Sequence, residues 1–292
     1  MKAGQIKMKI SDKFQKGKCV FSLEIFPPKR DMPPDTVYKT IDSLVKLSPA
    51  FISVTYGAGG TSGDNITGDM AAYIKSRGVD SAAHLTCVSN TKADIDILLA
   101  DLKAKGIENI LALRGDINPE RPPKHDFEHA VDLVRYIREH GDFHISGACY
   151  PECHTDAASF PEDICHLKEK VDAGVTHLMS QLFFDNEAFY RFLDMAHCAG
   201  INVPIEAGIM PVTNKKSIER MVSITGASLP AKFTRIMARY ENDPEALRDA
   251  GIAYAVDQIV DLISSGVDGI HLYTMNNPYV AEKIYSAVKG LM

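Results

Sequence analysis

The sequence lacks long apolar runs: no segment of its 292 residues stays apolar over the length needed to cross a bilayer. Residues 1–18 are basic but contain no apolar core of the kind found in a secretory signal. The sequence also lacks a clustered basic face, and its formal net charge of -6 argues against a surface that binds nucleic-acid phosphates. We therefore expect a cytoplasmic protein that acts on small molecules rather than on nucleic acid or membranes.

CxxC pairs are absent as well. The six cysteines are scattered at positions 19, 87, 149, 153, 165 and 198, and we expect most of them to be reduced and buried. Cys149, Cys153 and His154 lie close together in the sequence, but their spacing is poor for zinc and Pro151 intervenes. The sequence therefore predicts neither disulfides nor a metal site.

Short apolar runs are present instead, at residues 19–24, 51–55, 81–87, 109–113, 143–150, 176–184, 204–210 and 269–275. Seven of them are spaced by roughly thirty residues, the length of a strand plus a returning helix, which indicates parallel strands with helical crossovers. Segments with helical apolar spacing lie between the runs, at 35–47, 64–77, 91–105, 126–140, 161–173, 186–199, 214–224 and 278–289. Asn186 is the expected N-cap of the sixth.

The repeat predicts an α/β protein with a (β/α)8 TIM barrel. Residues 230–264 read as two extra helices inserted between the seventh and eighth strands. With 45% hydrophobic residues the chain can bury a large core, so we expect one domain over residues 1–292. A small C-terminal subdomain is the alternative.

Nearly every run stops on a polar residue: Glu24, Thr55, His84, Arg114 with Asp116, Tyr150, Gln181 and Tyr273. Reactive residues of such barrels gather where strands end. Polar groups in apolar surroundings cost free energy unless they are paired or used. The pattern therefore predicts a shared site at this end of the barrel. The alternative is that some of these groups only bond to one another.

The first and second strand ends each allow two interpretations. Glu24, followed by Pro27 and Pro28, is either a partly desolvated general acid or a strand-end carboxylate paired with a loop lysine. The glycine-rich loop at 54–63 matches neither GxGxxG nor GxxxxGK. Turn geometry is the simpler interpretation there, with Thr55 and Tyr56 as candidate ligand contacts.

Later strand ends favour contact with a flat ligand. Arg114 and Asp116 flank Gly115, which would allow a close backbone approach. Tyr150 and His154 suit stacking and hydrogen bonding, with core packing of Tyr150 as the alternative. Gln181 is another candidate, suited to hydrogen bonding with an amide-like edge. Asp163, His166 and Lys170 share one face of a predicted helix and are candidates too, although a solvated helix face would show the same pattern. Phe183 and Phe184 are expected in the core.

Taken together, FSLEIFPPK (21–29), AHLTC (83–87), NILALRGD (109–116), GACYPECH (147–154), KVDAGV (170–175), SQLFFDNEAFYRF (180–192), GIMPVTN (208–214) and HLYTMN (271–276) resemble the methylenetetrahydrofolate reductase family over nearly the whole chain. The resemblance implies an FAD-containing barrel that reduces 5,10-methylenetetrahydrofolate to 5-methyltetrahydrofolate. It further implies that NAD(P)H passes hydride to FAD and leaves before folate occupies the same flavin face.

The resemblance also implies roles for residues. Glu24 matches the family's general acid, and Asp116 matches an aspartate near flavin and pterin. Positions that match the FAD-binding residues are Thr55, His84, Arg114, Gly115, Asp116, Ala130, Tyr150, His154, Ala157, Asp163, His166 and Lys170; those that match the substrate-binding residues are Gln181, Asp116, Met221 and Asn277.

This sequence departs from the family pattern at several positions. His166 and Glu169 stand where the family often has Asn and Arg, Met221 replaces a phenylalanine, and Asn277 replaces an arginine that can meet the folate's glutamate tail. Two other functions stay open: a flavin-bearing subunit reduced by a partner protein, and a flavin-free barrel such as an aldolase or pterin-dependent methyltransferase. A homo-oligomer or a complex with an electron-transfer subunit also stays open.

Overall fold

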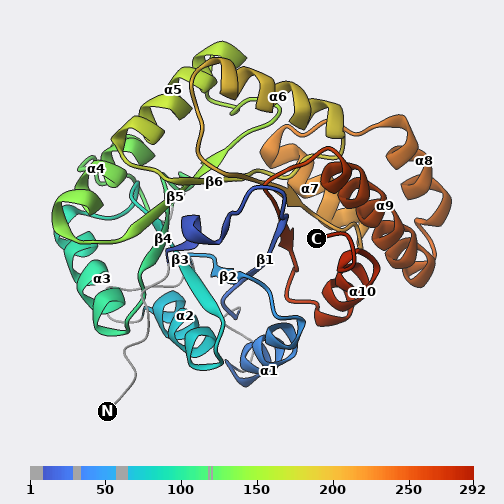
Figure 1. Cartoon of the computed structure of the whole chain (residues 1–292), viewed down its shortest axis with the longest axis horizontal. Helices are drawn as coiled ribbons and strands as arrows, with labels where there is room; N and C mark the ends of the chain where they lie inside the picture. The colour runs from blue at the N-terminus through green and yellow to red at the C-terminus, as the bar shows by residue number, and fades with distance from the viewer. Residues whose placement is uncertain (1–8, 29–33, 57–64, 118, 120) are drawn as a thin grey trace.

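The computed structural model describes residues 9–28, 34–56, 65–117, 119 and 121–292. Eight parallel strands form a closed barrel in which each strand pairs with the next and the eighth pairs with the first (Figure 1). The predicted (β/α)8 barrel is confirmed. Its strands are β1 (Val20–Ile25), β2 (Phe51–Val54), β3 (Asp80–Thr86), β4 (Asn109–Leu113), β5 (His144–Cys149), β6 (His177–Ser180), β7 (Ile205–Ile209) and β8 (Gly269–Tyr273).

Helices surround the strands in Figure 1. They are α1 (Pro34–Leu44), α2 (Ile66–Ser76), α3 (Lys92–Ala104), α4 (Ala130–His140), α5 (Phe160–Ala173), α6 (Asn186–Cys198), α7 (Lys215–Thr225), α8 (Ala231–Tyr240), α9 (Pro244–Ser264) and α10 (Pro278–Val288). The extra helices expected between the last two strands are α8 and α9. Whether residues 1–292 form one domain stays a prediction.

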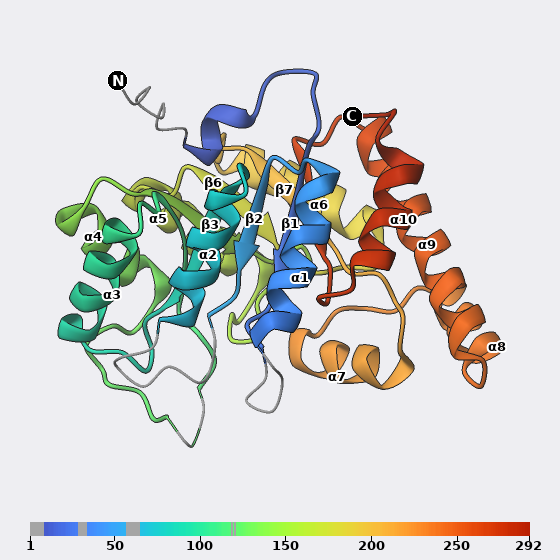
Figure 2. The same cartoon turned by 90° about the horizontal axis from the view of Figure 1, so that it is seen from below.

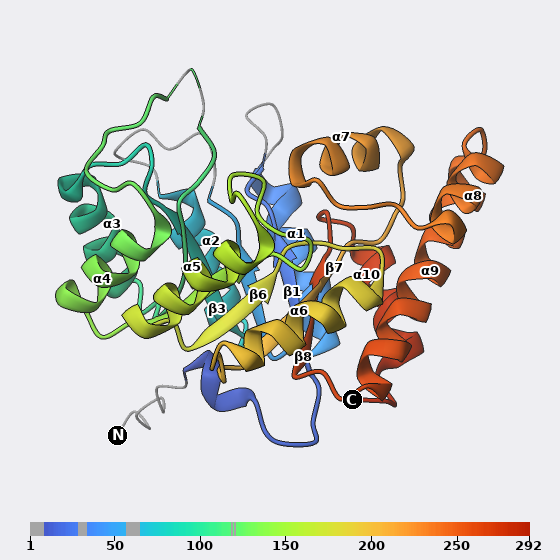
Figure 3. The same ribbon diagram turned by 90° about the horizontal axis from the view of Figure 1, so that it is seen from above.

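The two ends of the barrel differ. A short 3-10 helix, η1 (Ile10–Lys13), lies across the end where the strands begin, and α7 lies at the opposite end (Figures 2 and 3). Ile10 is fully buried there, and its backbone N–H donates to Asn109 Oδ1 at 3.1 Å. The strand starts are thus covered by chain, which leaves the carboxyl ends of the strands for a site.

The inserted helices pack closely on the barrel. Gly251 of α9 lies so near the segment after β7 that an added Cβ would fall 1.7 Å from the Val212 carbonyl oxygen. Phe233 of α8 and Tyr254 of α9 join Phe184 in a second apolar cluster. This packing anchors the insertion beside the ends of β6 and β7.

Several boundaries differ from the sequence prediction. The helix expected from residue 126 begins at Ala130, and the one expected to reach residue 47 ends at Leu44, followed by a 3-10 turn. Asn186 is not a cap: Asp185 caps α6, and the Asn186 amide instead donates to Asp261 Oδ2 of α9 at 2.7 Å. The tie to α9 explains why this asparagine starts the helix without capping it.

The cysteines are free thiols, but the expectation that most are buried is wrong. Only Cys87 and Cys149 are buried, because they lie in or beside strands, whereas Cys165 and Cys198 lie on exposed positions of helices. Within the part of the chain that the structure describes, no helix is long and apolar enough to cross a membrane.

Candidate active site at the carboxyl ends of the strands

Glu24 is nearly buried close to the end of β1, with 7% of its surface exposed. Two imidazoles converge on its Oε2 atom: Nε2 of His84 from β3 and Nε2 of His271 from β8 both lie 3.5 Å away. Burial lowers the pKa of His84 to about 4, so this ring is neutral near pH 7. The carboxyl group thus faces imidazoles; Lys29, in the loop beyond it, lies outside the described residues.

The segment after β8 fixes the exit of β1. Thr274 Oγ1 donates to the Glu24 carbonyl oxygen at 2.7 Å. The Asn276 amide makes two 2.9 Å hydrogen bonds with Phe26, accepting from its N–H and donating to its carbonyl oxygen. Asn276 has a φ of 55, a left-handed conformation that asparagine tolerates better than most residues. These contacts hold the backbone around the Glu24 carboxyl group.

A second polar group lies at the ends of β4 and β5. The His154 and Tyr150 rings meet edge to face at a centroid distance of 4.5 Å, and the His154 backbone N–H donates to Asp163 Oδ2 at 2.9 Å. Arg114 reaches this group through Asp156: its Nη2 lies 2.7 Å from Asp156 Oδ2, and the Asp156 backbone N–H donates to His154 Nδ1 at 3.0 Å. The sequence-predicted residues Arg114, Tyr150, His154 and Asp163 are therefore brought together.

Burial dominates the electrostatics of this group. It raises the pKa of Tyr150 to about 12 and lowers the pKa of His154 and Lys170 from their ordinary values. Lys170 Nζ donates to the Ala148 carbonyl oxygen at 2.7 Å, which leaves two of its three protons for other acceptors. A phenol, an imidazole and two cationic side chains thus lie within one partly buried region.

Besides the predicted close approach to a ligand, Gly115 has a reason in the fold itself. Its φ is 86, and a Cβ at this position would lie 2.9 Å from Thr86 Cβ on β3. The glycine therefore lets the chain turn after β4 against β3. Asp116, which follows it, is exposed.

Gln181 follows β6 and lies beside the second group. Its backbone N–H donates to the Cys149 carbonyl oxygen at 2.7 Å, and its Oε1 accepts from Leu182 N–H at 2.9 Å. A small pocket is lined by Tyr150, Cys153, Gln181 and Leu182, with four further residues. Gln181 and Tyr150, predicted from separate motifs, therefore border the same pocket.

The remaining predicted flavin contacts lie on several different elements. His166 is exposed on α5, Ala130 is the first residue of α4, and the Ala157 N–H donates to the His154 carbonyl oxygen. The Thr55 carbonyl oxygen accepts from Thr67 at 3.0 Å, whereas most of the loop at 54–63 lies outside the described residues.

Of the positions predicted to bind substrate, Met221 packs against the apolar cluster that contains Phe184. Asn277 caps α10 by accepting from the Val280 N–H at 3.3 Å, and it lines a second small pocket. Phe183 and Phe184 are buried, which confirms their expected place in the core.

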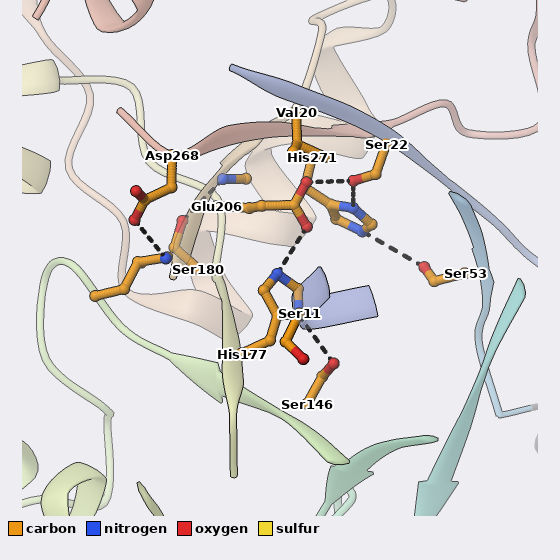
Figure 4. Close-up of polar contacts among 12 residues, drawn as sticks. Ser11, Val20, Ser22, Ser53, Ser146, His177, Ser180, Glu206, Asp268 and His271 are labelled. Carbon is orange, nitrogen blue, oxygen red and sulfur yellow. Dashed lines mark hydrogen bonds and ion pairs between the residues drawn. The ribbon is translucent and has the colours of Figure 1, made fainter. Parts of the chain in front are cut away.

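Sequence reasoning missed a chain of polar side chains inside the barrel (Figure 4). His177 of β6, Glu206 of β7 and His271 of β8 are all fully buried. Glu206 Oε1 accepts from Ser22 Oγ at 2.8 Å, and its Oε2 lies 3.0 Å from His177 Nε2. A titratable residue inside an apolar run, as in THLMS, PIEAGIM and GIHLYTM, was the signal that would have found them.

The chain matches the methylenetetrahydrofolate reductase family model over residues 9–289. This chain belongs to the methylenetetrahydrofolate reductase family. It is 39% identical to the 5,10-methylenetetrahydrofolate reductase of Pectobacterium carotovorum over 89% of this chain and 87% of that protein, and 38% identical to that of Escherichia coli K12 over the same shares. The resemblance predicted from the motifs is confirmed.

A plant member of the reductase family is longer. The Arabidopsis thaliana protein named methylenetetrahydrofolate reductase (NADH) 1 is 36% identical over 92% of this chain, which spans 49% of that protein. Among solved structures, an uncharacterized Clostridium thermocellum protein that binds two copies of 5-methyl-5,6,7,8-tetrahydrofolic acid matches with a TM-score of 0.68 over 97% of each chain at 13% identity. At that identity the likeness concerns the fold alone.

Proposed function

We propose that this protein reduces 5,10-methylenetetrahydrofolate to 5-methyltetrahydrofolate, with FAD as the resident cofactor and NADH or NADPH as the donor. The observation that carries the proposal is a nearly buried carboxyl group, Glu24, beside the site of Gln181. Tyr273 joins the two, because it pairs in register with Glu24 and its hydroxyl donates to the carbonyl oxygen of Ser180, one residue before Gln181. Relatives that cover most of the chain carry the reductase name.

The group around Tyr150 has the donors that FAD requires. Arg114 and Lys170 supply positive charge for a diphosphate, and Tyr150 and His154 supply hydrogen bonds and ring surfaces. When bound there, FAD supplies hydride transfer. Further proposed FAD contacts are Thr55, Gly115, Asp116, Ala130, Ala157, Asp163 and His166, of which Asp116 and His166 are exposed.

Glu24 is the proposed proton donor. Its proton passes to the folate nitrogen that leaves as the five-membered ring opens, and the electron pair of the broken C–N bond stays on that nitrogen. The other nitrogen then forms an iminium with the methylene carbon, which accepts hydride and becomes the methyl group. Asp116 is proposed to stabilise this cation, and Gln181 to bind the pterin edge.

His84 has a second proposed part besides flavin contact. Its Nε2 lies 3.5 Å from Glu24 Oε2, and burial keeps the ring neutral. His84 therefore brings no positive charge beside the Glu24 carboxyl group near pH 7.

The residues that depart from the family pattern affect binding of the folate's glutamate tail more than the chemical step. Met221 offers an apolar, adaptable surface where the family has an aromatic ring. Asn277 brings no positive charge and is already engaged as a helix cap. We therefore expect weaker discrimination for the length of the glutamate tail than an arginine at this position would give.

The test is an anaerobic stopped-flow measurement of each half-reaction. Yellow protein that is bleached by NADH or NADPH alone supports the nicotinamide donor, which the name of the Arabidopsis relative also specifies for that protein. Colour that persists until a partner protein is added supports an electron-transfer subunit instead. Colourless protein that binds no added FAD would overturn the proposal in favour of a flavin-free barrel.

The role of Glu24 is tested with Glu24→Gln. The variant is expected to keep reduction of the flavin by nicotinamide and to lose about 10² to 10⁴ in the rate of the folate half-reaction. Glu282→Gln, an exposed change on α10, is the matched control and should retain both rates. Equal loss of both half-reactions in Glu24→Gln would contradict the assignment.

A cytoplasmic location and a homo-oligomeric state stay predictions. The oligomeric state can be checked by measuring the mass of the protein in solution.

A further inference from the structure

The polar chain inside the barrel reaches Glu24 through His271. Ser22 Oγ lies 2.6 Å from His271 Nδ1 and 2.8 Å from Glu206 Oε1 (Figure 4). On its other side, His271 Nε2 lies 3.5 Å from Glu24 Oε2 and 3.4 Å from Ser53 Oγ. The register places Ser22 directly opposite His271, so the strands themselves hold this geometry.

The protons in this chain can be counted. Ser22 has a single hydroxyl proton, and an ionised carboxylate can only accept. If Glu206 is ionised, the Ser22 proton therefore points to Glu206, and Ser22 Oγ must accept a hydrogen bond from His271. His271 then carries a proton on Nδ1.

The far end of the chain favours an ionised Glu206. Its Oε2 lies 3.0 Å from His177 Nε2, and His177 Nδ1 lies 2.9 Å from Ser146 Oγ. When the Ser146 hydroxyl donates to Nδ1, the ring proton of a neutral His177 lies on Nε2, which is within ion-pair distance of the carboxylate although the two atoms do not form a hydrogen bond. A fully buried carboxylate needs such partners.

These contacts leave Nε2 of a neutral His271 without a proton, facing Glu24. The lone pair on His271 Nε2 and those of an ionised Glu24 would repel each other, whereas a protonated Glu24 donates to Nε2. We propose that His271, held by Ser22 and Glu206, is a positioning residue that keeps the Glu24 carboxyl group protonated until the substrate takes the proton. The proposal rests on the proposed function only in one respect, the transfer of the Glu24 proton to the folate.

The other titratable groups around Glu24 agree with this arrangement. His84 of β3 is neutral near pH 7 because burial lowers its pKa to about 4. The Tyr273 hydroxyl donates away from Glu24 to the Ser180 carbonyl oxygen at 2.6 Å, and burial raises its pKa well above the ordinary value. Near pH 7, neither of these two neighbours brings a positive charge that would favour a Glu24 carboxylate.

Ser22→Ala separates this proposal from simple electrostatics. Glu206→Gln would favour ionisation of Glu24 merely by removing a negative charge, whereas Ser22→Ala leaves that charge in place. Without Ser22, His271 is free to move its proton to Nε2 and to donate to a Glu24 carboxylate. The pH above which the folate half-reaction is lost should then fall by about one unit, a roughly tenfold loss of rate above that pH.

The experiment uses the holoenzyme and its two half-reactions. Reduction of the flavin by nicotinamide should be unchanged in Ser22→Ala. Ser81→Ala is the matched control, because it removes another buried strand hydroxyl, one with no hydrogen-bond partner among the described residues. A pH midpoint in Ser22→Ala equal to that of the wild type and of Ser81→Ala would overturn the proposal.

A second readout is the tautomer of His271, measured by 15N NMR of histidine-labelled holoenzyme and assigned with His271→Gln. The wild type is expected to carry its proton on Nδ1, and Ser22→Ala to shift it toward Nε2. A wild-type proton on Nε2 overturns the proposal even if Ser22→Ala does not fold. Because this measurement involves no folate, it stands if Glu24→Gln fails to support the proposed function.

Discussion

Asn276 gives the sharpest test of how the β8 segment controls the β1 exit. Its side chain makes two hydrogen bonds with the Phe26 backbone, each 2.9 Å long. A neutral hydrogen bond contributes about 0.5–1.5 kcal/mol net, so Asn276→Gly is expected to lower the free energy of unfolding by about 1–3 kcal/mol. Asn276→Ala should cost about 1 kcal/mol more, because the φ of 55 strains a residue with a Cβ.

Urea unfolding followed by circular dichroism measures both variants. Asn276→Asp is the matched intermediate, since it keeps the acceptor for Phe26 N–H and loses the donor to the Phe26 carbonyl oxygen. The expected order of stability is wild type, Asp, Gly and Ala. The folate half-reaction should slow in the same order, because Glu24 lies two residues before Phe26. Gly and Ala variants within 0.5 kcal/mol (roughly the effect of a neutral surface change) of the wild type would refute the reasoning.

Three further predictions concern stability, pH and the folate tail. Gly251→Ala should cost more than about 3 kcal/mol in urea unfolding because its Cβ meets backbone, whereas Gly290→Ala, with open space around it, should be nearly neutral. Burial lowers the pKa of His144 from 6.5 to about 3, so between these values the unfolded chain binds the proton more readily than the folded chain. The free energy of unfolding should therefore decrease as the pH is lowered from 6.5 to about 3, and His144→Asn should flatten this slope. Asn277→Arg should lose about 1 kcal/mol of helix capping yet lower KM for a folate with a longer glutamate tail, and unchanged KM would contradict the tail assignment.

The barrel was predictable because its strands are buried, seven of the apolar runs are evenly spaced, and nearly every run stops on a polar residue. Boundaries were not predictable where side chains redirect the backbone. The run at 176–184 gives a strand of only His177–Ser180, since Gln181 Oε1 turns back to the next backbone N–H. The apolar residues that follow pack instead into the core and beneath the inserted helices.

The site was predictable in position and less so in its contacts. Strand ends meet at one end of a barrel, so Glu24, Tyr150 and Gln181 could be grouped from the sequence. Which side chain touches which depends on register across strands far apart in sequence: Ser22 meets His271 only because β1 pairs with β8. The sequence showed a histidine in an apolar run without showing its partner.

The burial of Glu206 is the feature of the barrel that fold stability explains least. A carboxylate with no exposed surface costs several kcal/mol in desolvation, and apolar residues of similar volume often replace such pairs without loss of stability. The barrel also makes room for it: a Cβ on Gly269 would lie 2.8 Å from Glu206 Cγ and 3.0 Å from the Val20 carbonyl oxygen. A core built for stability would fill this space with a branched aliphatic side chain. The burial of Glu206 is therefore better explained by its role as the hydrogen-bond acceptor of Ser22. Through Ser22 and His271, this role extends to the proton on Glu24.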